Sequence, residues 1–282
     1  MGNKVKCTLC GAKIFQEIFN QGNSKILKCL SCGLTFRYPL PAKSEIQKLY
    51  NQEKLLKTRY FQGLKKNYDQ KNPVVSIYKE ELGKLNKITK PSRILDVGCA
   101  YGVFLDLARI YGWEPYGVEI SKTSASYAKK AFKLPIFAGT LEEAKYPSNF
   151  FKVITMWDLV EHLSEPLATL KETRRILEKN GILLILTIDT DSLIGKIANS
   201  TTKTKDFLYD PQHTYFFSSR TLAKMLQKAG FKKIETLDKF GAQIKRWQSR
   251  EIPLVLEIGT NLLDVIAKIA GMEYRQVIIA RK

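Results

Sequence analysis

Four of the five cysteines stand in two closely spaced pairs near the N-terminus. Cys7 and Cys10 form one C-x2-C pair, and Cys29 and Cys32 form the other after 18 intervening residues. Two such pairs supply the four thiolates of a structural Zn²⁺ site and leave no open position for catalysis. The metal would organise a segment that is too short to build its own core. Two disulfides or a redox pair are the alternatives, and the absence of a secretory signal disfavours both.

A glycine-containing turn follows a short apolar run. The segment D-V-G-C-A-Y-G at residues 96–102 places a carboxylate at the end of an expected strand and two glycines before an expected helix. A dinucleotide fold would need G-x-G-x-x-G here, so that the backbone can approach a pyrophosphate. Ala100 stands at the second glycine position, so the turn favours a nucleoside without a diphosphate. Glu119 ends the next expected strand, where a carboxylate can accept both hydroxyls of a ribose.

The chain has two histidines, and both follow expected strands. His162 comes soon after the fourth strand, and His213 lies in the loop after the fifth. The carboxyl ends of parallel strands meet at the edge where a doubly wound fold keeps its site. A histidine there can act as a general base because imidazole titrates near neutral pH. We place the base at His213, with His162 as the competing candidate and Glu161 to orient or replace it; structural roles for both histidines are the alternative.

A possible metal motif overlaps this region. Asp158, Glu161 and His162 form D-x-x-E-H, and three such ligands on one turn could hold Mg²⁺ beside a diol. The commoner role of adjacent Glu and His at this place is positioning without metal. We therefore do not favour a Mg²⁺ site.

These motifs together resemble the class I S-adenosylmethionine-dependent methyltransferases over about residues 73–282. The resemblance rests on D-V-G-C-x-x-G at 96–102, on Glu119 in G-V-E-I-S, on E-H-L at 161–163 and on H-x-x-x-F-S at 213–218. It is strongest to a small-molecule branch, many members of which carry a four-cysteine module and are found with polysaccharide or natural-product biosynthesis. The D-x-x-E-H motif is also similar to the E-x-x-E-H of ubiquinone-pathway O-methyltransferases, where it looks metal-binding.

The resemblance implies S-adenosylmethionine as the methyl donor. The backbone of residues 98–102 would hold its methionyl part, Glu119 its ribose, and residues 140–142 its adenine. Ala100 replaces the usual middle glycine and is small enough to leave room. The cofactor-contacting positions implied are Asp96, Gly98, Cys99, Ala100, Gly102, Glu119, Ile120, Thr140, Leu141 and Trp157.

An alternation of strands and helices must position these residues. Apolar runs predict strands at 93–97, 116–119, 151–156, 182–188, 234–237 and 277–280. Helical periodicity and capping residues predict helices at 103–110, 121–131, 164–181, 218–230 and 254–270. This alternation predicts an α/β fold with a doubly wound, mostly parallel sheet. The resemblance implies that the sheet has seven strands and is of the Rossmann-like methyltransferase type.

Composition divides the chain into three segments. Residues 1–40 hold the cysteine module, residues 41–90 form a helical connecting or substrate-cap segment, and residues 91–282 form the methyltransferase core. Within the core, residues 189–212 are long for a loop and predict a substrate lid. The middle segment would fold its side chains over the open edge of the site. These side chains are the aromatic Tyr50, Tyr60, Phe61 and Tyr68 and the cationic Arg59 and Lys65.

The net charge of +19 is concentrated toward the N-terminus, where residues 1–90 carry 18 Lys and Arg against 6 Asp and Glu. A cationic module attracts phosphates, although a lysine-rich solvated surface accounts for the charge equally well. We expect an anionic small-molecule or carrier-bound acceptor, such as a nucleotide sugar, and O-methylation rather than C-methylation. The alternatives are RNA methylation guided by the basic module and a non-catalytic zinc-ribbon protein that binds nucleic acid.

Several classes are excluded. Apolar residues at 44% and aromatic residues at 11% are ordinary globular values and not those of a disordered chain. The longest apolar run, Ile182–Leu186, is far below the roughly 20 residues of a membrane span. Neither the N/D-P-P-Y/F of base-amine methyltransferases nor the Pro-Cys of cytosine-C5 enzymes is present. The N-terminus lacks the apolar stretch of a secretory signal, so we expect a cytoplasmic protein.

Overall fold

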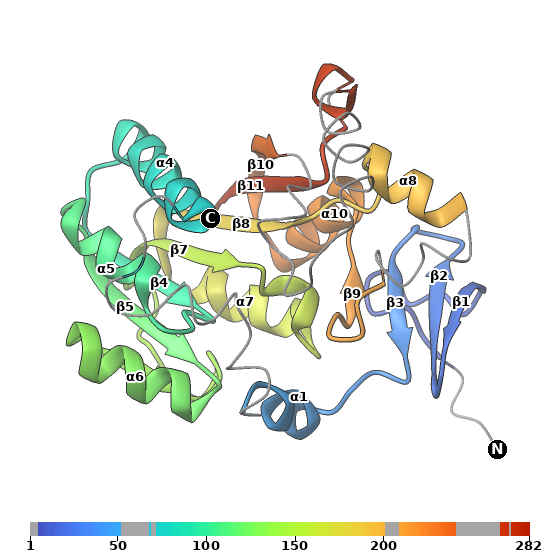
Figure 1. Ribbon diagram of the computed structural model, residues 1–282, viewed down its shortest axis with the longest axis horizontal. Helices are drawn as coiled ribbons and strands as arrows, with labels where there is room; N and C mark the ends of the chain where they lie inside the picture. The colour runs from blue at the N-terminus through green and yellow to red at the C-terminus, as the bar shows by residue number, and fades with distance from the viewer. Residues whose placement is uncertain (1–4, 52–67, 69–71, 201–208, 241–265, 271) are drawn as a thin grey trace.

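The structure, a computed structural model, describes residues 5–51, 68, 72–200, 209–240, 266–270 and 272–282. A seven-stranded sheet forms its centre, in the spatial order β10-β11-β8-β7-β4-β5-β6 (Figure 1). Strands β4 to β8 run parallel, whereas β11 is antiparallel to both of its neighbours. The strands are β4 (Arg93–Val97), β5 (Glu114–Glu119), β6 (Ile136–Ala138), β7 (Phe151–Trp157), β8 (Leu177–Ile188), β10 (Lys232–Phe240) and β11 (Arg275–Arg281).

Helices cover both faces of this sheet, and each face has its own core. Ile94 packs with α4 (Pro73–Ile88), α5 (Val103–Ile110) and α6 (Lys122–Phe132). Leu95, the next residue of β4, packs on the other face with α7 (Pro166–Ile176) and α10 (Ser219–Ala229). The run 182–186 is apolar throughout because both faces of β8 are buried. The doubly wound, mostly parallel seven-stranded sheet is thereby confirmed.

Local signals fixed most helix boundaries. Ser121 caps α6 by accepting from the Ser124 amide, and Gly230, in the left-handed region, closes α10. The expected helix end at Gly181 is wrong, because α7 stops at Ile176 and Gly181 lies inside β8. A Cβ on Gly181 would meet the Glu178 carbonyl oxygen at 2.9 Å, so the glycine allows a close backbone approach at the irregular start of that strand. Residues 254–265 of the helix expected at 254–270 lie outside the described residues, and residues 266–269 are helical.

The cysteine module is a small sheet that continues into the core. Its strands β1 (Phe15–Gln21), β2 (Ser24–Cys29) and β3 (Thr35–Tyr38) are antiparallel. β3 pairs in turn with β9 (Tyr215–Phe216), a two-residue strand of the core that lies beside it in Figure 1. Leu34 and Phe36 share one apolar cluster with Leu222 and Met225 of α10. The sequence predicted the module but neither its strands nor this docking.

The segment 41–90 is helical where the structure describes it. α1 (Lys43–Tyr50) and α4 are its helices, and Asn72 caps α4. Tyr68 packs on Phe132 and bonds to Asp106 of α5, and it lines neither of the two cavities described below. The other residues expected over the site, Arg59, Tyr60, Phe61 and Lys65, lie outside the described residues.

The expectation of a continuous loop at residues 189–212 is wrong for part of its length. Residues Leu193–Ser200 form α8, whose Ile194 packs with Ile26 of the module and Phe216 of β9. Residues 201–208 lie outside the described part, so the lid stays a prediction. No helix in the described residues is both long and apolar enough to span a membrane.

Candidate active site

The four cysteines predicted to bind metal lie together. Sγ of Cys7 is 3.5 Å from Sγ of Cys32, and the same distance separates Cys10 from Cys29. All four sulfur atoms lie within 4.8 Å of one another. A disulfide would need about 2.05 Å, whereas bonds of about 2.3 Å to one tetrahedral Zn²⁺ would place sulfurs nearly 4 Å apart. The geometry fits a four-thiolate metal site and not two disulfides.

The turn between β4 and α5 is folded around the carboxylate of Glu119. Its two oxygens accept from the backbone amides of Ala100 at 2.8 Å and Ser121 at 2.7 Å. Gly98 and Ala100 have φ of +76° and +46°, a left-handed conformation that favours glycine at the first position and is strained at the second. Burial raises the pKa of Glu119, and the amide bonds partly offset this effect. A carboxylate offers about four lone-pair sites, so Glu119 can still accept from a ribose hydroxyl.

Two adjoining cavities open beside this turn. The larger is lined by seven of the ten predicted cofactor positions: Gly98, Ala100, Glu119, Ile120, Thr140, Leu141 and Trp157. The smaller shares Gly98, Ala100 and Trp157 with it and adds Asp96 and Cys99. Gly102 lines neither cavity. A Cβ there would lie 2.9 Å from Leu134 and 3.0 Å from Ala128, so this glycine serves the close packing of α5 against α6.

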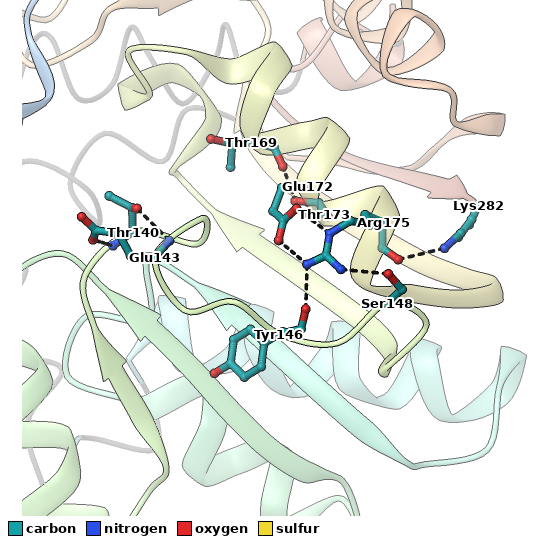
Figure 2. A network of polar contacts seen from close by, with 9 residues as sticks. All are labelled: Thr140, Glu143, Tyr146, Ser148, Thr169, Glu172, Thr173, Arg175 and Lys282. Atoms are coloured by element: carbon teal, nitrogen blue, oxygen red, sulfur yellow. Dashed lines mark hydrogen bonds and ion pairs between the residues drawn. The ribbon is translucent and has the colours of Figure 1, made fainter.

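The wall expected at the adenine is held by local polar bonds. The Thr140 amide donates to a Glu143 carboxylate oxygen at 2.8 Å, and the Glu143 amide returns a bond to the Thr140 hydroxyl, as Figure 2 shows. Glu142, which also lines the larger cavity, accepts from the Thr169 hydroxyl at 2.7 Å. Arg175 of α7 holds the segment at 146–148 in place by donating hydrogen bonds to the Tyr146 carbonyl and the Ser148 hydroxyl (Figure 2).

The cavities carry polar groups that suit S-adenosylmethionine. Nε1 of Trp157 is buried and has no hydrogen-bond partner among the described residues, so a ligand can accept from it. Asp96 is buried, accepts from the Thr155 hydroxyl at 2.7 Å, and has a pKa well above its usual range because burial disfavours its charge. It would pair with the ammonium of the methionyl part, and Glu119 would hold the ribose. The residues present therefore fit this methyl donor.

His162 lies on the wall of the larger cavity, and one of its two ring nitrogens is hydrogen-bonded to the protein. Its Nδ1 is 3.1 Å from the Gln212 carbonyl oxygen. A carbonyl can only accept, so Nδ1 carries the proton and Nε2 keeps a free lone pair. Burial lowers the pKa of His162 below its ordinary value, and the ring is neutral at pH 7. The side chain can therefore accept a proton at Nε2.

His213 packs against His162 but does not line the cavity. The two rings meet edge to face with centroids 4.6 Å apart, and Nδ1 of His213 is buried without a partner among the described groups. Burial places the pKa of His213 well below its ordinary value, helped by the positive charge of Arg37 and by that of His162 when its ring is protonated. Glu161 beside them is 1% exposed, and burial raises its pKa to about 7.

The structure gathers a different potential metal set from the one the sequence indicated. Asp158 of D-x-x-E-H forms an ion pair with Arg275. Glu161, His162 and His213 instead bring their ligand atoms within 4.8 Å of one another, so two imidazoles and a carboxylate could accept a divalent cation. The role expected from the sequence, in which Glu161 and His162 position groups without a metal, needs no divalent cation.

Three residues of α1 complete the larger cavity. Lys43, Ile46 and Tyr50 line it, and the Tyr50 ring stands edge-on to His162 with centroids 5.8 Å apart. Sequence reasoning placed Tyr50 near the site but missed the other two, because no motif marks them. The ammonium of Lys43 is 3.5 Å from the Glu165 carboxylate, and both side chains are more than half exposed.

A family model described as a methyltransferase domain matches residues 72–236, which is more than half of the chain. The chain belongs to this family. With its sheet and its cofactor turn it is a class I S-adenosylmethionine-dependent methyltransferase.

Sequence relatives match part of the chain. An uncharacterized protein of Methanocaldococcus jannaschii is 28% identical over 177 residues, 62% of this chain and 82% of that protein. A demethylmenaquinone methyltransferase of Bacillus pumilus is 26% identical over 48% of this chain and 64% of its own length. A ubiquinone biosynthesis O-methyltransferase of Pelagibacter ubique is 31% identical over 37% of this chain and 45% of its own. The chain thus spans less than two thirds of the two quinone enzymes.

Solved structures show the same fold. A methyltransferase from Archaeoglobus fulgidus has a TM-score of 0.54 at 21% identity, covering 79% of this chain and all of that one. The [4+2]-cyclase SpnF has a TM-score of 0.61 at 16% identity, covering 86% and 98%. A cyclase on this fold means that the acceptor chemistry must be argued from the site.

Proposed function

We propose that the protein methylates a hydroxyl of a small or carrier-bound acceptor that carries an anionic group, such as a nucleotide sugar or another precursor of a polysaccharide or natural product. The observation that carries this proposal is the state of His162. Its ring lies on the cavity wall with Nδ1–H donated to Gln212, so Nε2 is free to take a proton. A hydroxyl has a proton to lose on methylation, so a neutral base at this place suits an oxygen nucleophile.

The residues of the chain would then act as follows. When bound, S-adenosylmethionine supplies a sulfonium methyl group, which an oxygen takes in a single in-line displacement. Nε2 of His162 accepts the hydroxyl proton while the new O–C bond forms and the S–C bond breaks. Tyr50 and Leu163 form apolar walls that hold the acceptor and keep out water. The products are a methyl ether, S-adenosylhomocysteine and a proton on the imidazole.

The anionic group of the acceptor would meet α1. Lys43 is the one Lys or Arg among the described residues that line the larger cavity. Its partner Glu165 is exposed, so the pair is weak and can open for a phosphate or carboxylate. The excess of Lys and Arg over Asp and Glu in residues 1–90 adds a general positive charge that attracts anions.

The four cysteines would hold one structural Zn²⁺. Their sulfur positions support this assignment, and the ligand set is closed to substrate. Reduced thiolates belong to a reducing compartment, which supports a cytoplasmic location.

The test is an acceptor screen with release of S-adenosylhomocysteine as the readout. The panel contains nucleotide sugars, lipid-carrier fragments, hydroxylated quinone precursors and RNA. With the best acceptor, His162→Ala should lower kcat by about 10²- to 10⁴-fold and leave the affinity for S-adenosylhomocysteine unchanged. If His213→Ala loses turnover while His162→Ala keeps it, the base is His213. Release with RNA alone would show that the acceptor class is wrong.

A further inference from the structure

The cysteine module reaches the histidine pair through one short strand pairing. Thr35 and Phe36 of β3 are in register with Phe216 and Tyr215 of β9. The Arg37 amide extends this ladder by donating to the Thr214 carbonyl at 2.9 Å. β9 begins two residues after His213, so the module is bonded to the turn that carries this histidine.

The Arg37 side chain is also hydrogen-bonded to this turn. Its Nε donates to the His213 carbonyl at 3.1 Å, and its Nη2 donates to the Asp210 carbonyl at 3.1 Å. Nη2 also donates to the Gln21 side-chain oxygen of β1 at 2.9 Å. Arg37 as a whole residue is 9% exposed, so these bonds are largely shielded from water. Arg37 thus ties two carbonyls of the turn to the module.

The carbonyl that sets the state of His162 lies between the two that Arg37 holds. Asp210 and His213 flank Gln212, whose carbonyl faces Nδ1 of His162. Within the turn, the Gln212 amide donates a hydrogen bond to the Asp210 carboxylate at 2.7 Å. The turn is joined to the Glu161 backbone by the Thr214 amide at 2.8 Å. Any rotation of the turn would therefore move the Gln212 carbonyl away from His162.

We propose that Arg37 is a positioning residue of the active site, through which the cysteine module fixes the Nδ1–H tautomer of His162. Arg37 lines neither cavity of the site, and its side chain donates to carbonyl and amide oxygens of the protein, so it is not the group that binds the acceptor's anion. Without the Gln212 carbonyl, His162 can carry its proton on Nε2, which then has no lone pair to accept the proton of the hydroxyl. The catalytic consequence rests on the proposed function of His162, but the tautomer itself does not.

The first test reads the tautomer directly. Because the chain has two histidines, ¹⁵N-histidine labelling gives a simple two-bond ¹⁵N–¹H correlation spectrum, and His213→Ala assigns it. Wild type should show His162 with a protonated Nδ1. Arg37→Ala should show a mixture or the Nε2–H form, and Arg37→Lys a smaller change, because an ammonium cannot span both carbonyls in the same geometry. An unchanged Nδ1–H pattern in folded Arg37→Ala overturns the proposal.

The second test is kinetic and uses the acceptor found in the screen. Arg37→Ala should lower kcat by about 10- to 100-fold, with cofactor affinity within twofold and acceptor KM within threefold of wild type. Lys25→Ala is the matched control, because it removes an exposed cation of β2 that pairs with Glu17 and has no bond to the turn. If Arg37→Ala does not fold, Arg37→Lys carries both tests. Full kcat in Arg37→Ala or Arg37→Lys, in a protein where His162→Ala is inactive, overturns the inference and leaves the proposed function standing. Full kcat in His162→Ala shows that His162 is not the base, and the spectrum then decides the tautomer alone.

Discussion

The two halves of the site are built in different ways. The cofactor half lies at the ends of neighbouring strands, and its bonds join residues close in sequence, such as Glu119 with Ala100 and with Ser121. The half proposed to bind the acceptor is lined by α1 and His162, and it is supported by the turn at 210–214, where Arg37 of the cysteine module bonds to a residue 176 positions away. The cofactor half should therefore tolerate damage to the module, and the acceptor half should not.

The largest expected effect is on the cofactor half. Glu119→Ala removes two charge-assisted bonds to the turn and the ribose acceptor, so affinity for S-adenosylhomocysteine should fall at least about 100-fold by calorimetry. Glu142→Gln is the control, because this carboxylate lines the same cavity but is engaged by Thr169, and its affinity should stay within about threefold. Equal losses in both variants would show that charge in the cavity matters and that the turn does not.

The second prediction separates the halves by removing metal. Mass spectrometry of the native protein should find one zinc per chain, lost in Cys29→Ser. Chelation should lower kcat at least about tenfold by releasing β3 from β9, and readdition of zinc should restore it. Cofactor affinity should stay within about threefold, because no residue of the module lines the larger cavity. Loss of cofactor binding in parallel with turnover would contradict the independence of the two halves.

The same division explains what the sequence could predict. The strands, the turn at 96–102 and Glu119 were predictable because capping, periodicity and strand ends are local signals. Both histidines were expected at one edge of the sheet, and the structure brings them together, while the choice of the base stays a prediction. Their distinct positions, with His162 on the cavity wall and His213 behind it, depend on long-range packing. β9 is two residues long and Arg37 carries no motif, so nothing local marks the contact between module and core.

The third prediction concerns pH and the methionyl end of the cofactor. Burial raises the pKa of Asp96, so the cofactor-free carboxyl keeps its proton to a higher pH than usual, whereas a bound ammonium would favour its charged form. Cofactor affinity should therefore rise with pH through that raised pKa, by up to about tenfold per pH unit, with proton release seen by calorimetry in different buffers. Asp96→Asn should bind more weakly and lose this slope. An unchanged slope would assign the titration to Glu119, whose pKa burial also raises.

The smallest expected effect is at the outer edge of the acceptor half. Lys43→Met removes the cation of α1 that faces the larger cavity, and acceptor KM should rise about two- to fivefold, because an exposed charge contributes little in water. Cofactor affinity and kcat should not change, and the rise in KM should shrink at high salt as the charge is screened. Lys48→Met is the matched control on the same helix, since Lys48 is exposed and does not line the cavity. A change of equal size in Lys48→Met would mean that the general positive field attracts the acceptor. A loss of cofactor affinity in Lys43→Met alone would instead place α1 in the cofactor half and redraw the boundary between the two.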